Sequence, residues 1–411
     1  MSSVSEAAPT AVGERIRRLR LASGLSQVEF AGLAGLAGNS AVSLIENGRT
    51  PVTGAALDAI ASVLKCSPDF LRRPTPSPLM TQPLMRAYAD APQRLVDRQL
   101  ADAALALELV ETLELRTIPD RLPIFHGDLA DEHTIEQFAL DVRAAADLDE
   151  GAVVGNSIRT AERLGCVVLP MPDELGRHLG MSVRIDATPV LCLGKSSVDD
   201  GRQVPGDRQR FTVAHEIGHL SLHSHLGPPR TAQESALYEK QAHRFAGAFL
   251  APGDAMLEEL ESLGGRVTLR TLASIKSRWG IAIKALVMRF RALDVIDADH
   301  ARSLYKQISA RGWNKDEPVP VGPETAVWLR LAMEKRFATG SDGLRLCAAR
   351  AGIDVSHLHR WLDWGADSES AQVLALPKRA TADNQTASDA SVTLMMGRRP
   401  RPRPTSERLE G

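Results

Sequence analysis

Apolar residues recur with helical spacing along most of this chain. A compact helical pattern runs from about residue 13 to 73 and is followed by the proline-rich stretch RRPTPSPLMTQP, which predicts a linker because proline disfavours helix around it. From about residue 85 to 115 the sequence is rich in Ala, Leu, Glu and Arg. Its leucines return at positions that form one helical stripe, so we expect a long connecting helix there.

The middle of the chain combines segments of helical spacing with short apolar runs of strand length. Helical spacing over residues 135–148 and 153–164 gives way to two short apolar runs, CVVLPM at 166–171 and TPVLCL at 188–193, each bounded by Gly, Pro or Asp. Runs of that length predict strands. Helical spacing then returns over residues 266–304, and further helices are expected between 324 and 364.

Bulk composition narrows the class of protein. A length of 411 residues predicts two or three domains, and a formal net charge of -2 implies no particular partner. The four cysteines lie far apart, without metal-ligand spacing, which fits a reducing compartment. The chain has no stretch of ~20 apolar residues and begins with a polar segment unlike a secretory signal. We therefore expect a cytoplasmic protein that makes no use of a membrane.

The strongest chemical motif is His215-Glu216-Ile217-Gly218-His219, within the helical pattern FTVAHEIGHLSLH. Residues four apart on a helix share a face, with Cβ atoms about 6 Å apart, so both imidazoles can reach one metal. A catalytic zinc takes three protein ligands and leaves the fourth place to water, whose pKa falls towards ~7. Glu216 lies beside this place and is the predicted general base.

Several residues are candidates for the third ligand. His225 has the spacing of a longer zinc motif, but Leu222 stands where that motif needs glycine. His223 continues the same helical face, yet three ligands in a row would span ~12 Å of helix axis. We therefore expect His223 to support the site rather than to bind the metal. A carboxylate from the next helix remains, and Glu239 is preferred over Glu234 because small residues beside Glu239 allow close helix approach. Zinc is expected, although Mn or Fe could use the same nitrogen and oxygen donors.

These residues carry a family resemblance. The run RQRFTVAHEIGHLSLH followed by ExxAHRFAGAFLAP resembles the ImmA/IrrE metallopeptidases over roughly residues 120–315. The resemblance implies a small α+β zincin-like peptidase domain with zinc on His215, His219 and Glu239, and Glu216 as catalytic base. It also implies a role, because members of this family cleave repressors in response to stress or mobile elements. Where the family usually has Asn or Asp, this chain has His243.

The N-terminal pattern indicates a DNA-binding module. Ser26 and Glu29 form a capping box, so a helix should begin at Gln27, and a second helix should begin near Asn39. Residues 13–73 resemble the XRE (lambda repressor-like) helix-turn-helix family, and such folds also serve as protein-binding modules. The arginines of the first helix give residues 13–73 an excess of positive charge that the whole chain lacks. The expected small core is Phe30, Ala31, Val42, Ile45, Leu57 and Ile60, and the expected DNA contacts are Gln27, Asn39, Ser40, Ser43 and Arg49.

The combined prediction is a mostly helical α+β protein that acts as a DNA-bound zinc endopeptidase. Its expected partners are DNA, through residues 13–73, and a protein substrate of the helix-turn-helix repressor type; a homodimer is left open. The alternative is a helix-turn-helix regulator whose peptidase-like domain senses a ligand without cutting. The expected segments are a flexible N-terminus (1–12), a helix-turn-helix domain (13–73), a linker and connecting helix (74–117), a peptidase domain (118–260), a helical region (261–365) and a disordered tail (366–411).

Overall fold

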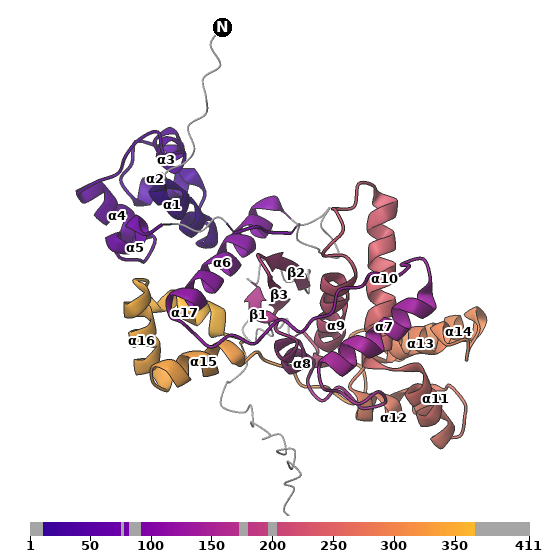
Figure 1. The fold of residues 1–411 in the computed structure, drawn as a ribbon. Coiled ribbons are helices and arrows are strands. Elements are labelled where there is room, and N and C mark those ends of the chain that lie inside the picture. The colour runs from indigo at the N-terminus through magenta and orange to yellow at the C-terminus, as the bar shows by residue number, and fades with distance from the viewer. Residues whose placement is uncertain (1–10, 75–77, 82–91, 172–179, 196–203, 366–411) are drawn as a thin grey trace, which may run out of the picture. The chain divides into compact units, whose positions relative to one another are not determined.

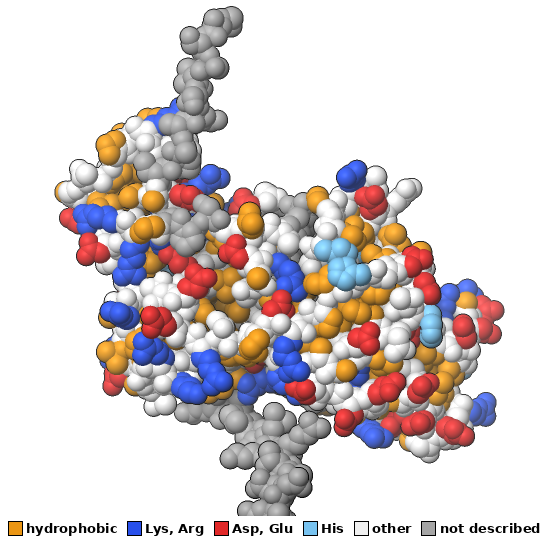
Figure 2. Space-filling model, viewed as in Figure 1, with side chains coloured by type: hydrophobic (Ala, Val, Ile, Leu, Met, Phe, Trp, Pro, Cys, Tyr) orange, Lys and Arg blue, Asp and Glu red, His pale blue; other side chains and the backbone are white. Residues whose placement is uncertain are grey.

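The computed structural model describes residues 11–74, 78–81, 92–171, 180–195 and 204–365, and the predicted tail (366–411) lies outside these residues. The described part is mostly helical around one small three-stranded sheet, which confirms the predicted fold class (Figure 1). Acidic and basic side chains are interspersed on the face in Figure 2, as the small net charge suggests. No helix in the described ranges is long and apolar enough to cross a membrane.

The N-terminal domain is a bundle of short helices. The predicted capping box is present, because the Ser26 side chain accepts from the backbone of Glu29 while the Glu29 side chain accepts from the backbone of Ser26. All six residues of the predicted core are buried. The helices are α1 (Ala11–Ala22), α2 (Gln27–Leu33), α3 (Asn39–Glu46), α4 (Ala55–Val63) and α5 (Pro68–Arg72).

The predicted connecting helix is α6 (Gln93–Thr112), and α1 packs against it. Glu108 of α6 pairs with two arginines of α1: Arg15 lies 2.5 Å from one carboxylate oxygen and Arg18 lies 3.5 Å from the other. Arg15 is fully buried and also donates to the carbonyl of Pro74. A buried charge is costly unless it is paired, so Glu108 helps to hold the helix-turn-helix domain against α6.

The sheet has the strand order β1-β3-β2, with β1 (Val167–Met171) parallel to β3 (Thr188–Gly194) and β2 (Gly180–Ile185) antiparallel to it. The two strands expected from the apolar runs are therefore confirmed, whereas β2 was not foreseen. Alternate side chains point to opposite faces of a strand. Val167 and Leu169 accordingly join a core with α6, while Val168 packs in a second core with the helices beyond the sheet.

The second core contains α9 (Gly206–Leu222), which carries His215 and His219 and is called the metal helix because it is predicted to bind the metal. Figure 1 shows α9 and α10 side by side on the far side of the sheet from α6. Apolar residues of the later helices, such as Leu272, Leu286 and Leu304, belong to this same core. Its helices are α7 (Glu132–Ala145), α8 (Ser157–Arg163), α9 (Gly206–Leu222), α10 (Ala232–Leu250), α11 (Gly253–Ser262), α12 (Leu269–Trp279), α13 (Ile283–Ala292) and α14 (Ala298–Ala310).

The last described helices are α15 (Trp328–Arg336), α16 (Gly340–Ala351) and α17 (Val355–Leu362). They share the core of the helix-turn-helix domain and α6 rather than that of the metal helix. Cys66 forms an antiparallel bridge with Ile353, and His357 donates from Nε2 to the carbonyl of Leu64 at 3.1 Å. Helices were expected in this region, and Gly352, which ends α16, has a left-handed backbone with φ of 80°. All four cysteines are free thiols.

Glu324 ties the chain after α14 to the metal helix. One carboxylate oxygen accepts from the backbone of Ser157 and Ile158 at 2.7 and 3.0 Å, at the N-terminus of α8. The other lies 2.5 Å from Arg210 of α9. Glu324 and Arg210 are 8% and 5% exposed, and because an unpaired buried charge is costly, each charge stabilises the other. The segment that carries Glu324 is therefore part of the structure that holds α9.

Candidate metal centre

His215 and His219 lie one turn apart on α9 and are both buried. Their imidazole centroids are 4.6 Å apart, with the ring planes almost perpendicular. Apolar neighbours such as Val213, Ile217 and Leu220 bury the remaining faces of the helix in the core. The four-residue spacing thus places both rings on one face, as expected for an i, i+4 pair.

Glu239 of α10 faces both histidines. One of its carboxylate oxygens lies 3.4 Å from Nε2 of His215, and the other lies 3.3 Å from Nε2 of His219. Close helix packing allows this approach. A Cβ at Gly218 would lie only 2.9 Å from the ring of Phe245 on α10, so α9 and α10 could not pack at this distance with a larger residue there. The three side chains proposed as ligands are thus brought together.

The chemistry of this cluster fits a metal ion. Nε2 of both histidines and one oxygen of Glu239 are buried without a hydrogen-bond partner among the described residues. Donors bound at about 2.0–2.1 Å to a tetrahedral zinc lie about 3.3–3.4 Å from each other. Burial lowers the pKa of His215 to about 3, which keeps it neutral. Burial alone would raise the pKa of Glu239, but the two imidazoles beside it hold that pKa below its usual range. Neutral imidazoles and a carboxylate are the forms that bind metal.

A chain of hydrogen bonds fixes the orientation of His219. The amide nitrogen of Gln241 donates to the carbonyl of Leu129 at 2.9 Å, so its oxygen must face His223 and accept from Nε2 at 3.0 Å. Nδ1 of His223 then has a lone pair and accepts from Nδ1 of His219 at 3.0 Å. Nε2 of His219 is left unprotonated and directed at Glu239. His223 thus supports the site, as expected, and Gln241 is a contributor that the sequence did not reveal.

Glu216 is 1% exposed and faces the edge strand β2. The hydroxyl of Ser182 donates to one of its carboxylate oxygens at 2.6 Å. A Cβ at Gly180 would lie 2.8 Å from the other oxygen, so glycine lets the strand pass close to the acid. The alternation of Met181, Val183 and Ile185 with smaller or polar residues was the available signal for this strand.

The other ligand candidates lie outside the cluster. His225 is exposed, with its ring 5.4 Å from that of His126. Glu234 is exposed at the N-terminus of α10, where it accepts from the backbone of Arg230. His243, one turn beyond Glu239, does belong to the cluster: potential ligand atoms of His215, Glu239 and His243 all lie within 4.8 Å of one another.

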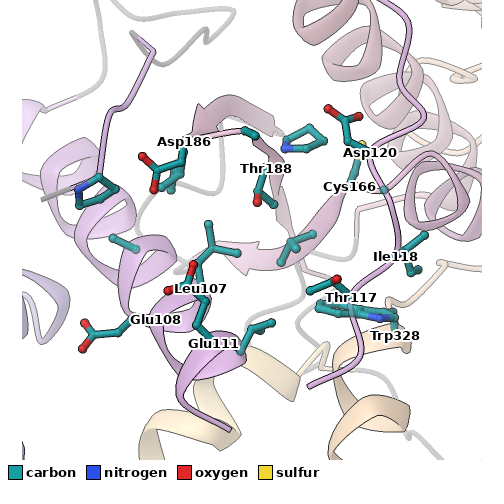
Figure 3. A pocket seen from close by; sticks show the side chains of 18 of the residues that line it. Leu107, Glu108, Glu111, Thr117, Ile118, Asp120, Cys166, Asp186, Thr188 and Trp328 are labelled. Carbon is teal, nitrogen blue, oxygen red and sulfur yellow. The ribbon is translucent and has the colours of Figure 1, made fainter. Parts of the chain in front are cut away.

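The described residues enclose several cavities. One of about 480 Å³ adjoins the metal cluster, with mainly apolar walls from α7, α10 and α13 and with His243 in its wall. Another, of about 290 Å³, lies between α6, the turn joining β2 to β3, and Trp328 (Figure 3). Two of the acidic residues that line it accept hydrogen bonds: Asp120 accepts one from Arg184, and Asp186 accepts one from the backbone of Leu79. None of the predicted metal ligands lines this second cavity.

The predicted DNA contacts show two situations. Asn39 and Ser40, at the start of α3, and Arg49 just beyond it are exposed, and Ser43 is half-buried. The amide of Gln27, in contrast, donates to Glu46 at 2.9 Å within the domain. Contacts of these residues with DNA stay a prediction.

The positive excess of the helix-turn-helix domain is only partly a surface property, because three arginines of α1 are buried in ion pairs. Arg20 pairs with Glu46 at 2.6 Å, and Arg15 and Arg18 pair with Glu108. All three arginines are at most 9% exposed. Carboxylates contributed by other helices neutralise them, and a pattern of charges in one helix does not reveal its partners.

Comparison with known families agrees with this arrangement. Residues 161–291, which include β1, α9 and α10, match the model of the IrrE N-terminal-like domain of the M78 peptidases. Residues 11–73 match the model of a helix-turn-helix domain. Neither the curated proteins nor the solved structures contain a match. The chain thus carries a segment similar to the IrrE N-terminal-like domain of the M78 metallopeptidases, preceded by a helix-turn-helix domain.

Proposed function

We propose that this protein is a zinc endopeptidase that regulates transcription by cleaving a repressor-type protein when stress or a mobile element signals. One observation carries the proposal: Nε2 of His215 and of His219 is buried without a hydrogen-bond partner among the described residues and lies 3.3–3.4 Å from the Glu239 carboxylate. Glu216 lies next to them on the same helix. A site meant only for structure would need no such acid.

The proposed roles of the side chains follow from their places. His215, His219 and Glu239 would hold a zinc ion, which when bound supplies a Lewis acid that activates water and polarises a carbonyl. Glu216 would take a proton from the attacking water and deliver it to the nitrogen of the leaving amine as the C–N bond breaks. The hydrogen bond from Ser182 keeps the Glu216 carboxylate in one orientation.

Substitution of Glu216 tests the assignment. Glu216→Gln should keep zinc bound and slow cleavage by about 10²–10⁴-fold, because the general base is lost while the ligands remain. His215→Ala and His219→Ala should lose both zinc and cleavage. The substrate to test is the repressor encoded nearest to this protein, incubated with and without a chelator, and a discrete fragment is the expected product. Cleavage by Glu216→Gln at the rate of the unchanged protein would contradict the mechanism.

The third ligand has a matched control. Glu239→Gln should weaken zinc binding strongly, whereas Glu234→Gln, a change of the same kind at the exposed start of the same helix, should leave it unchanged. Equal zinc affinities for the two variants would remove Glu239 from the ligand set.

A regulatory domain that senses a ligand without cutting is the second candidate. The proximity of His243 to the cluster favours it, since a fourth protein donor would close the coordination shell. Retained DNA regulation in Glu216→Gln, with no cleavage by the unchanged protein, would support this alternative.

A further inference from the structure

We propose that His243 is a fourth protein ligand, so that the metal is held by four side chains until His243 moves away. The inference rests on the metal centre of the proposed function and adds a latent state to it. The ring of His243 lies 4.6 Å from that of His215, at an interplanar angle of 75°. Its potential ligand atom lies within 4.8 Å of those of His215 and Glu239.

The tautomer of His243 suits this role. Its Nδ1 lies 2.8 Å from the backbone carbonyl of Glu239, one turn earlier on α10. A carbonyl oxygen can only accept, so Nδ1 carries the hydrogen and the neutral ring has its lone pair on Nε2. Metal-binding histidines commonly use this arrangement, in which the second nitrogen donates to a carbonyl. The backbone of the helix that supplies Glu239 thus prepares His243 to bind.

The geometry needs only a small adjustment. Glu239 already lies at tetrahedral separations of 3.3–3.4 Å from His215 and His219. His243 lies within 4.8 Å of the ligand atoms of His215 and Glu239, at most about 1.5 Å beyond the tetrahedral separation, so a small rotation of its ring would bring a fourth donor to the metal. Zinc sites with four protein ligands are closed, whereas catalytic sites keep one place open.

The adjoining cavity provides a place for His243 when it leaves. His243 lies in the wall of the 480 Å³ cavity, together with Phe211, whose ring is 5.6 Å from its own. The ring is half-buried, so it can rotate into this space without unpacking the core.

The number of imidazoles on the metal tests the proposal in the full chain. Zinc K-edge X-ray absorption should count three imidazoles in the unchanged protein without substrate, and two in His243→Asn. Loss of a residue that merely orients a ligand costs 10–100-fold in metal affinity, so loss of a true ligand should exceed about 100-fold in competition with a chelator. His243→Asn should also cleave the repressor faster than the unchanged protein. His225→Asn, on the exposed neighbouring loop, should change none of these readouts.

The outcomes separate the two proposals. Two imidazoles in the unchanged protein, or a loss of affinity below about 100-fold in His243→Asn, would overturn the role of His243 and leave the peptidase standing. An unchanged protein that binds no zinc would overturn the metal centre itself. The count in the unchanged protein needs no variant, so it decides even if His243→Asn does not fold.

Discussion

Glu324→Gln should destabilise the core around α9 although the residue lies outside the segment that matches the peptidase family. An amide has only one acceptor oxygen, so its NH₂ group must face either Arg210 or the backbone N–H of Ser157, and both are donors. Breaking a buried ion pair at one partner costs about 3–5 kcal/mol. Arg210 still donates to the carbonyls of Val154 and Gly155, so we expect the free energy of unfolding to fall by about 3 kcal/mol, the lower end of that range.

Urea denaturation measures this loss. With an m-value of roughly 3 kcal/mol/M, the midpoint of the transition that unfolds α9 should fall by about 1 M. Glu114→Gln is the matched control, because Glu114 is 81% exposed and pairs with Arg336 at 3.2 Å on the surface. That change should cost less than about 1 kcal/mol. Equal midpoints for the two variants would refute the view that Glu324 anchors the metal helix.

Two further substitutions test other buried histidines. His223→Phe removes the acceptor of the His219 Nδ1 hydrogen and should weaken zinc binding about 10–100-fold in a chelator competition, whereas no loss would make the hydrogen-bond chain irrelevant. Burial lowers the pKa of His357 in the folded protein. As the pH falls below about 6.5, His357 is therefore protonated in the unfolded chain before it is protonated in the folded protein, and the free energy of unfolding falls by up to about 1.4 kcal/mol per pH unit. Thermal unfolding between pH 7.5 and 5.5 should show this slope and its reduction in His357→Gln; identical slopes would contradict it.

Local signals in the sequence were sufficient for the metal helix and the capped helix at Gln27. In both, the residues that interact are three or four apart, so spacing alone implies contact. The strands at 167–171 and 188–194 followed from apolar runs of strand length. The fold class and the family resemblance were predictable on the same grounds.

Long-range partners could not be read in this way. The helical spacing of residues 328–362 predicts helices but not that they share a core with the N-terminal domain instead of the metal helix. Gln241 supports His219 only because its amide nitrogen donates to the carbonyl of Leu129, more than a hundred residues earlier. Its amide oxygen therefore faces His223. The domain boundaries drawn from composition therefore stay predictions, since periodicity records that a face is buried and not what buries it.

The inward-facing arginines have a consequence for DNA binding. Residues 11–73 contain eight Lys and Arg, and three of the arginines, Arg15, Arg18 and Arg20, are buried in ion pairs. Arg73 donates to the carbonyl of Ala351. The basic residues of this domain that the structure leaves exposed are Arg17, Arg49, Lys65 and Arg72. Few cations can therefore neutralise phosphates.

The salt dependence of binding measures that number. Each phosphate neutralised contributes about -0.9 to the slope of log K against log salt, so four exposed cations limit the slope to about -3.6 for each bound copy. Fluorescence anisotropy of a labelled operator over a salt series gives the slope, and sedimentation of the complex gives the number of copies. A slope near -7 for one copy would mean that the arginines of α1 leave Glu108 and Glu46 to reach DNA. Because breaking those pairs strands a buried carboxylate, we expect the shallow slope, with base contacts from α3 supplying most of the discrimination.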